Sequence, residues 1–129
     1  IVLAGDYQGQ KASAPMMSDL AIFHVCIESS GGTWLYNVPK SFETIVLYIR
    51  QGSCTIDNME IPVHHTAYCE PIGSTLRVDS KTGVDFLLLA GAPLREPVAA
   101  QGSMVMNTQS QINEAYRDYQ LGLMGMPWS

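Results

Sequence analysis

Residues Leu87–Thr108 read LLLAGAPLREPVAAQGSMVMNT, and this stretch decides how the rest of the chain is interpreted. An apolar run breaks at Gly91, the chain then crosses Pro93 and Pro97, and a second short apolar run stops at Asn107. Glycine and proline are the strongest local interruptions of regular structure. The stretch therefore predicts a strand, a proline-rich crossover and a second short strand.

The hydrophobic period changes directly after this stretch. Thr108 and Gln111 have the spacing of a capping box, in which the two side chains satisfy free backbone groups at a helix start. One helical face then collects four residues, Ile112, Ala115, Tyr116 and Tyr119. Gly122 tolerates the left-handed conformation that ends many helices. We expect a helix over about 109–121.

Upstream of this stretch, β-forming runs alternate with turn residues. Two of the richest are 20–28 (LAIFHVCIE) and 42–50 (FETIVLYIR). Shorter runs occupy 33–38, 53–56, 59–63, 66–70, 75–79 and 85–90. Many short strands at near-regular intervals are typical of sandwiches and barrels. The predicted fold class is all-β, a sandwich or barrel with one short C-terminal α-helix.

Composition excludes several classes of protein. Of 129 residues, 47% are apolar and 15% are charged, which excludes a disordered chain and favours one domain with its own core. The net charge is −5 and the basic residues are scattered, so the sequence predicts no basic face for direct nucleic-acid binding. No apolar run approaches the roughly 20 residues of a membrane-spanning helix. Three cysteines without a secretory signal favour reduced thiols in the cytoplasm or nucleus.

The first 15 residues are short of large aliphatic side chains and predict a linker loop, which leaves 16–129 as the folded domain. The chain starts at Ile1, without an initiator methionine and inside an apolar run. We therefore expect that a further segment precedes it.

The histidines do not form a recognisable metal motif. His64 and His65 are adjacent, and neighbouring side chains on a strand point to opposite faces. His24 stands alone on an apolar strand face, where a structural, hydrogen-bonded histidine is the commoner outcome than a ligand. The spacings of cysteines and histidines match no zinc template. We expect no metal site from these residues and no catalytic residue in this chain.

The remaining reactive groups have ordinary interpretations. Cys54 and Cys69 fall inside strand-like runs, which favours buried core thiols over nucleophiles, since a reactive cysteine needs a partly exposed, electropositive setting. Asp79 and Asp85 lie at or near predicted turns, where solvated carboxylates are expected. No pair of carboxylates is placed to tune the two pKa values apart.

Gly91-Ala92-Pro93-Leu94-Arg95-Glu96-Pro97 followed by Val105-Met106-Asn107-Thr108 resembles the C-terminal signature of the pirin family. The residues that carry the resemblance are Gly91, Pro93, Glu96, Pro97, Met106, Asn107 and Thr108. The family pattern has Pro-Phe where this chain has Ser103-Met104, a departure that alters local packing. The resemblance covers nearly the whole chain and implies a cupin-type antiparallel β-barrel of the jelly-roll or sandwich type, with a short C-terminal α-helix.

Pirins are two-barrel proteins, and the resemblance implies an iron ion in the N-terminal barrel and none in the C-terminal one. The first cupin motif is Gly, five residues and His-x-His, and from Gly32 it reaches Val38 and Lys40 here. The second motif, Pro-x-Gly-x-x-His, ends at Leu76 instead of histidine. We therefore expect no cofactor in this chain and iron in a missing N-terminal barrel.

Two functions follow as hypotheses. In the first, the chain is the C-terminal barrel of a pirin-like protein and supports an N-terminal iron barrel, in a quercetin 2,3-dioxygenase-like enzyme or a transcription co-regulator. Its partner would be that barrel or a second copy of this chain, with no membrane contact. The alternative is a single-barrel cupin that binds a small molecule in its own cavity, lined by His24, Tyr36, Glu43 and Tyr48.

Overall fold

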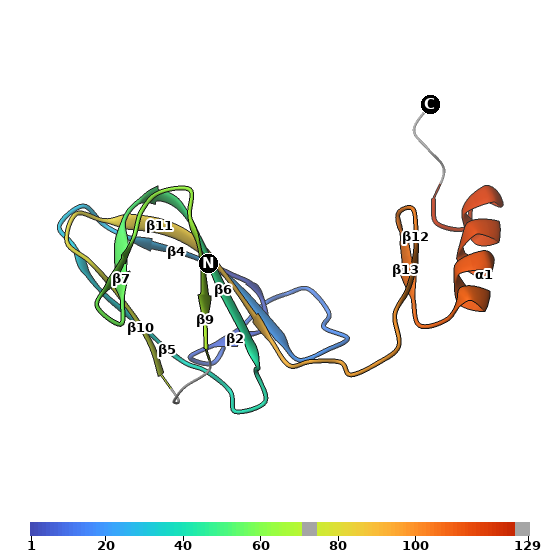
Figure 1. Cartoon of the computed structure of the whole chain (residues 1–129), viewed down its shortest axis with the longest axis horizontal. Helices are drawn as coiled ribbons and strands as arrows, with labels where there is room; N and C mark the ends of the chain where they lie inside the picture. The colour runs from blue at the N-terminus through green and yellow to red at the C-terminus, as the bar shows by residue number, and fades with distance from the viewer. Residues whose placement is uncertain (71–74, 126–129) are drawn as a thin grey trace. The chain divides into compact units, whose positions relative to one another are not determined.

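The structure, a computed structural model, describes residues 1–70 and 75–125 (Figure 1). Positions 71–74, which carry the first part of the second cupin motif, lie outside the described residues. The chain forms two compact units, Ile1–Pro93 and a second unit that begins at Leu94. The length of the chain alone had favoured one domain.

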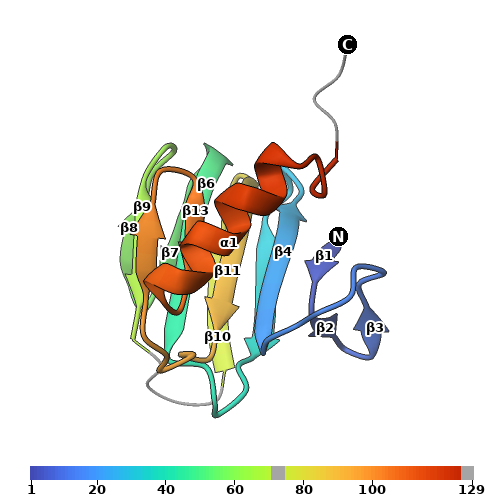
Figure 2. The same ribbon diagram turned by 90° about the vertical axis from the view of Figure 1, so that its right-hand side faces the viewer.

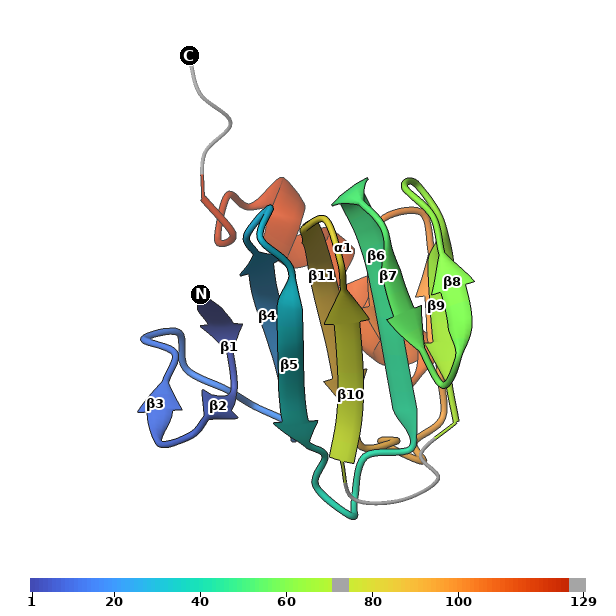
Figure 3. The same cartoon turned by 90° about the vertical axis from the view of Figure 1, so that its left-hand side faces the viewer.

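The first unit consists of two antiparallel sheets that face each other (Figures 1 and 3). One has five strands in the order β1 (Val2–Ala4), β4 (Leu20–Ile27), β11 (Val84–Gly91), β6 (Thr44–Gly52) and β9 (Thr66–Cys69). The other has four, β5 (Gly32–Asn37), β10 (Thr75–Ser80), β7 (Cys54–Ile56) and β8 (Met59–Ile61). The predicted all-β class is confirmed, although the sheets do not close into a continuous barrel.

Alternation along the strands decides which side chains fill the space between the sheets. On β11, Val84, Phe86, Leu88 and Ala90 are buried, and Asp85, Leu87 and Leu89 take the opposite face because neighbouring residues on a strand point opposite ways. β4 and β6, which flank β11 (Figure 2), follow the same rule. The core is therefore formed by one face of each sheet. The side chains between the buried ones lie on the second, outer face of the five-stranded sheet.

Two tight turns fix the register of neighbouring strands. Asp57 and Asn58 have φ angles of 47° and 63° and join β7 to β8, with Ile56 opposite Met59. Positive φ at both central residues is the two-residue hairpin geometry that Asp and Asn tolerate. Gly52 has a φ of 73°, and a Cβ there would collide with the carbonyl oxygen of Gly83. Both turns lie between runs that the sequence predicts as strands, 42–50, 53–56 and 59–63.

The first 15 residues contain more structure than the predicted linker loop. β1 is the edge strand of its sheet and pairs with β4, and β2 (Asp6–Tyr7) and β3 (Gln10–Lys11) form a small hairpin. The Tyr7 ring stacks on Trp34 at 5.6 Å and meets Phe23 edge-on at 5.5 Å. Pairing with β4 and this aromatic contact order the segment, and neither is visible in its composition.

The second unit contains a two-stranded hairpin, β12 (Ala99–Gln101) and β13 (Met104–Met106), and the helix α1 (Gln109–Gln120). The capping box is present as predicted, since Thr108 Oγ1 accepts from the Gln111 backbone and Gln111 Oε1 accepts from the Thr108 backbone. The Tyr116 hydroxyl donates to the Gln101 carbonyl at 2.8 Å, which joins α1 to β12. Among the described residues, no helix has the length and apolar character needed to cross a membrane.

Candidate functional site

The interior of the first unit does not fit an iron ion at the cupin ligand positions. Val38 and Leu76 are 8% and 7% exposed and belong to the hydrophobic core, and Lys40 is exposed. Metal ions need lone-pair donors, which valine and leucine lack, and a protonated lysine repels a cation. Where an iron-binding cupin carries histidines, this unit therefore offers no ligand.

Large apolar side chains fill the space between the two sheets. Those that are essentially inaccessible to solvent in the first unit include Phe23, Leu47, Ile49, Val78, Phe86 and Leu88. Phe23 also meets Tyr36 edge-on at 5.0 Å between ring centres. No buried side-chain polar atom in the described part of the chain lacks a hydrogen-bond partner. The centre is a packed core, and any ligand site lies at its margin.

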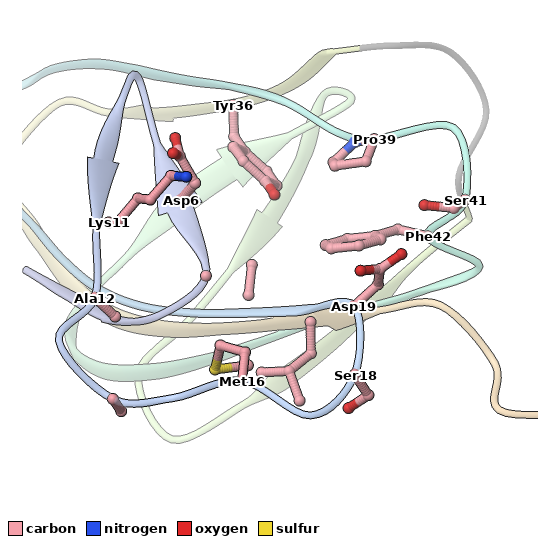
Figure 4. A pocket seen from close by; sticks show the side chains of 14 residues that line it. Asp6, Lys11, Ala12, Met16, Ser18, Asp19, Tyr36, Pro39, Ser41 and Phe42 are labelled. Carbon is pink, nitrogen blue, oxygen red and sulfur yellow. The ribbon is translucent and has the colours of Figure 1, made fainter.

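A pocket of about 490 Å³ lies at that margin, where the start of β4 meets the end of β5 (Figure 4). The rings of Tyr36 and Phe42 point into it, and Asp6, Lys11 and Asp19 supply charged groups along its walls. Burial, and next the charge of Asp6, raises the pKa of the Tyr36 hydroxyl, which therefore stays protonated. The pocket combines an apolar floor with a few polar groups, as small-molecule sites do.

The chemistry available in this pocket favours binding over catalysis. Its lining includes carboxylates, serine hydroxyls and a lysine, but neither histidine nor cysteine. A serine nucleophile needs a base within hydrogen-bond reach, most often a histidine, and the described lining residues supply no imidazole for that role. The pocket can hold and orient a small polar ligand.

The four residues expected to line a cavity are separated by the structure. Tyr36 is buried and lines the pocket. His24 and Tyr48 lie on the outer face of the five-stranded sheet, because their neighbours along β4 and β6 are buried or partly buried in the core. Glu43 is exposed before β6, where its backbone N–H donates to Gly91.

On the outer face, His24 belongs to a polar cluster that was missed from the sequence. Its Nε2 lies 3.0 Å from both carboxylate oxygens of Asp85 and 3.5 Å from Cys26 Sγ, and Cys26 Sγ lies 3.5 Å from Asp85 Oδ2. Arg50 Nη1 approaches His24 Nε2 at 3.2 Å and Asp85 Oδ1 at 3.4 Å. The available signal was the His-x-Cys spacing, which puts both side chains on one face of a strand.

Three neighbouring strands build this cluster. Cys26 on β4 lies directly opposite Asp85 on β11, and His24 lies diagonally from Asp85. Arg50 on β6 has no partner in the register between Ile49 and Gln51, so it is the extra residue of a β-bulge opposite Asp85 and Phe86. Bulges redirect side chains, and this one accompanies the approach of the guanidinium to the carboxylate.

The cluster also shifts the protonation of its members. Partial desolvation raises the pKa of the Cys26 thiol, and the hydrogen bond to Asp85 and its charge raise it further. At Asp85, desolvation opposes ionisation, but the hydrogen bonds from His24 and Cys26 and the charge of Arg50 outweigh it and lower the pKa of the carboxyl. Asp85 is therefore a carboxylate at neutral pH, partly buried and surrounded by donors, and not the solvated turn residue that was expected.

Comparison with known proteins agrees with the fold and the sequence signature. The family model of the pirin C-terminal cupin domain matches residues 25–125. This chain belongs to that family. The pirin resemblance noted in the stretch 91–108 is thereby confirmed, and the match includes both compact units.

Relatives of this pirin domain are longer proteins. A pirin-like protein from Solanum lycopersicum is 33% identical over 96% of this chain and 43% of its own length. Pirin-1 from Arabidopsis thaliana is 32% identical over 92% of this chain and 43% of its own. The crystal structure of a quercetin 2,3-dioxygenase from Acinetobacter baumannii matches with a TM-score of 0.79 and 26% identity over 96% of this chain and 43% of that one. The chain thus spans less than half the length of these relatives.

Proposed function

We propose that this pirin domain is the supporting, metal-free barrel of a two-barrel protein whose N-terminal barrel binds iron. The observation that carries the proposal is the replacement of the cupin ligands by Val38, Lys40 and Leu76, of which Val38 and Leu76 belong to the packed core. The intact protein would then be a quercetin 2,3-dioxygenase-like enzyme or a transcription co-regulator. Within it, this chain would bind no iron in its interior and catalyse no step alone.

The outer face of the five-stranded sheet supports a role in association. The register places Ile22, Leu89, Val46 and Tyr68 in one row across four strands. Leu89 is 43% exposed and Tyr68 82% exposed. Apolar groups aligned across an open sheet face favour contact with another protein surface. The occupant that we propose is the iron-bearing barrel, with a second copy of this chain as the competing outcome.

The test is a chimera made from the Acinetobacter baumannii enzyme, with this chain in place of the region that it matches. We expect the chimera to retain iron and consume quercetin, and a form truncated at the junction to lose both. Leu89→Asp should reduce iron retention and activity in the chimera, because a charge would be buried in the contact. Leu35→Asp is the matched control, since Leu35 is 49% exposed on the other sheet.

Two results would count against the proposal. One is quercetin turnover by this chain alone after loading with ferrous iron. The other is equal loss in the Leu35 and Leu89 variants, which would show that the row across the five-stranded sheet has no particular part in association.

The pocket beside Tyr36 favours a second candidate function, in which this domain itself binds a small polar molecule. Its volume of about 490 Å³ and its charged rim carry this candidate. Ligand-observed NMR with a library of small polar aromatic molecules tests it. Binding that weakens in Asp19→Asn and persists in Asp57→Asn, a turn substitution on another part of the surface, would support the candidate. A library without hits would remove it.

The compartment is part of the same proposal. The cysteines at positions 26, 54 and 69 are all free thiols. Unpaired cysteines are typical of proteins kept in a reducing environment, which supports the cytoplasm or the nucleus as the place where this chain functions.

A further inference from the structure

The outer-face cluster of His24, Cys26 and Asp85 carries an inference that is independent of the barrel interior. Its nitrogen, sulfur and carboxylate donors all lie within 4.8 Å of one another. The three residues come from two adjacent, fully hydrogen-bonded strands, so the backbone that holds them is part of the rigid sheet. A cluster of three different donor types on such a support has the composition of a transition-metal site.

The distances within the cluster match those of a tetrahedral zinc ion. With ordinary zinc–ligand bond lengths and tetrahedral angles, the donors would be separated by about 3.3 Å (N to O), about 3.6 Å (S to N) and about 3.5 Å (S to O). The corresponding distances here are 3.0 Å, 3.5 Å and 3.5 Å. Small side-chain rotations are therefore enough to place all three donors around one ion.

Two contacts of His24 Nε2 require different tautomers of the ring, so only one of them is a hydrogen bond at a time. Nε2 must carry a hydrogen to donate to the Asp85 carboxylate, but it must have a free lone pair to accept from Arg50. A single nitrogen cannot do both in one protonation state. A metal ion between Nε2, Sγ and the carboxylate would use the histidine lone pair and the carboxylate together, and Arg50 would retain the other carboxylate oxygen.

In the isolated chain, the site is also reachable from solvent. Cys26 and Asp85 line a surface hollow of about 330 Å³, and His24 and Cys26 line another of about 270 Å³. A fourth ligand can therefore approach from outside the sheet. Among the described residues, the Arg50 guanidinium and the amino group of Ile1 are nearby cations that oppose a metal ion. The Arg50 side chain is half-exposed, so its guanidinium can move toward solvent when an ion binds.

We propose that His24 Nε2, Cys26 Sγ and Asp85 form a zinc site on the outer face of the five-stranded sheet, with water in the fourth position. Three protein ligands and one open position are the arrangement of zinc sites that bind exchangeable ligands. The site would take Zn²⁺, or Co²⁺ as its spectroscopic substitute. Arg50 reduces the affinity by its charge.

The experiment titrates the reduced, metal-free chain with Co²⁺ under anaerobic conditions and follows the near-ultraviolet thiolate-to-cobalt charge-transfer band. We expect one Co²⁺ per chain, displaced by one Zn²⁺. Cys26→Ser should abolish the band. Asp85→Asn and His24→Gln should weaken binding by about tenfold or more, since each removes a direct ligand. Circular dichroism of each variant verifies that the sheet is intact.

Matched substitutions separate this site from other thiols and charges. Cys69→Ser should leave the band unchanged, because Cys69 points into the core on β9. Arg50→Gln should tighten binding by about fivefold, whereas Arg77→Gln, the same change on the other sheet, should have no effect. If the wild-type chain shows no thiolate band, or Cys26→Ser and Cys69→Ser lose it equally, the site does not exist.

The proposal of iron in a preceding barrel and the proposal of zinc on this outer face are tested independently of each other. The cobalt titration uses this chain alone and reads a thiolate ligand, which the histidines of the cupin motifs do not supply. A failed quercetin assay in the chimera would leave the cobalt result unaffected, and a missing cobalt band would leave the supporting role of the domain unaffected.

Discussion

The side-chain amide of Asn107 donates to the carboxylate of Glu96 at 3.0 Å and joins the two halves of the stretch that identifies the family. The same amide nitrogen also donates to the carbonyl of Pro97 at 2.9 Å. The signature residues are separated by the β12–β13 hairpin in sequence, but these bonds bring them together at its base. Their role here is structural, since they close a hairpin directly before α1.

We expect Asn107→Ala to destabilise the second unit by about 1–2 kcal/mol, because two hydrogen bonds are lost and one of them involves a charged acceptor. Hydrogen exchange of the α1 amides measures the loss locally. Asn113→Ala, also an exposed asparagine on this unit, should be neutral or slightly stabilising, since alanine favours the helix. Equal effects of both substitutions would contradict a role for the Glu96 contact.

The helix cap gives a second expectation. Thr108→Ala removes the hydroxyl that accepts from the Gln111 backbone and should cost about 1 kcal/mol of helix stability. Helical content from circular dichroism during thermal unfolding reports the change. Ser110→Ala, inside the helix, is the control and should not lower it.

Neighbouring leucines on β11 should respond very differently to truncation. Leu88 is 0% exposed, and Leu88→Ala should lower the free energy of unfolding by about 2–5 kcal/mol through lost burial and a residual cavity. Leu89 takes the outer face, and Leu89→Ala should cost less than about 1 kcal/mol in the isolated chain. Urea denaturation of the two variants compares them directly. Similar losses would show that the outer face is covered.

The Cys54 thiol should be unreactive at neutral pH and should make stability depend on alkaline pH. Burial, and next the neighbouring Cys69, raises its pKa from 9.0 to about 11. The unfolded chain therefore loses this proton first, so the stabilisation is complete below pH 9.0 and is lost as the pH rises to about 11. Unfolding midpoints across this range measure the decline, and in Cys54→Ala the decline should be smaller.

The sequence was informative where a single segment determines its own structure. The alternation on 42–50 and 85–90, the turn at Asp57-Asn58 and the capping box at Thr108 depend on residues a few positions apart, and all appear in the structure. Spacing likewise identified Val38 and Leu76 as the residues at cupin ligand positions, and the structure places both in the hydrophobic core. Local patterns of this kind need no knowledge of which strands are neighbours.

What the sequence could not provide is the pairing of distant strands. His24 and Asp85 are 61 residues apart and meet only because β4 and β11 are adjacent in a defined register. The β1 strand was missed for the same reason, since it is ordered by its pairing with β4. The division at Pro93 also depends on contacts across the chain. Period-two alternation reveals the faces of a strand, but not its neighbours.

The bulge at Arg50 also bears on how this domain tolerates changes in length. The register between β6 and β11 skips Arg50: Ile49 lies opposite Phe86, and Gln51 lies opposite Asp85. A one-codon deletion at this position would keep all of these pairs and turn the bulged ladder into a regular one. Elsewhere in β6, a one-residue deletion would shift the rest of the strand by one position. Its core-facing residues would then point to the outer face, and its outer residues into the core. A lineage could therefore gain or lose the cation beside His24 through a single insertion or deletion, without repacking the core.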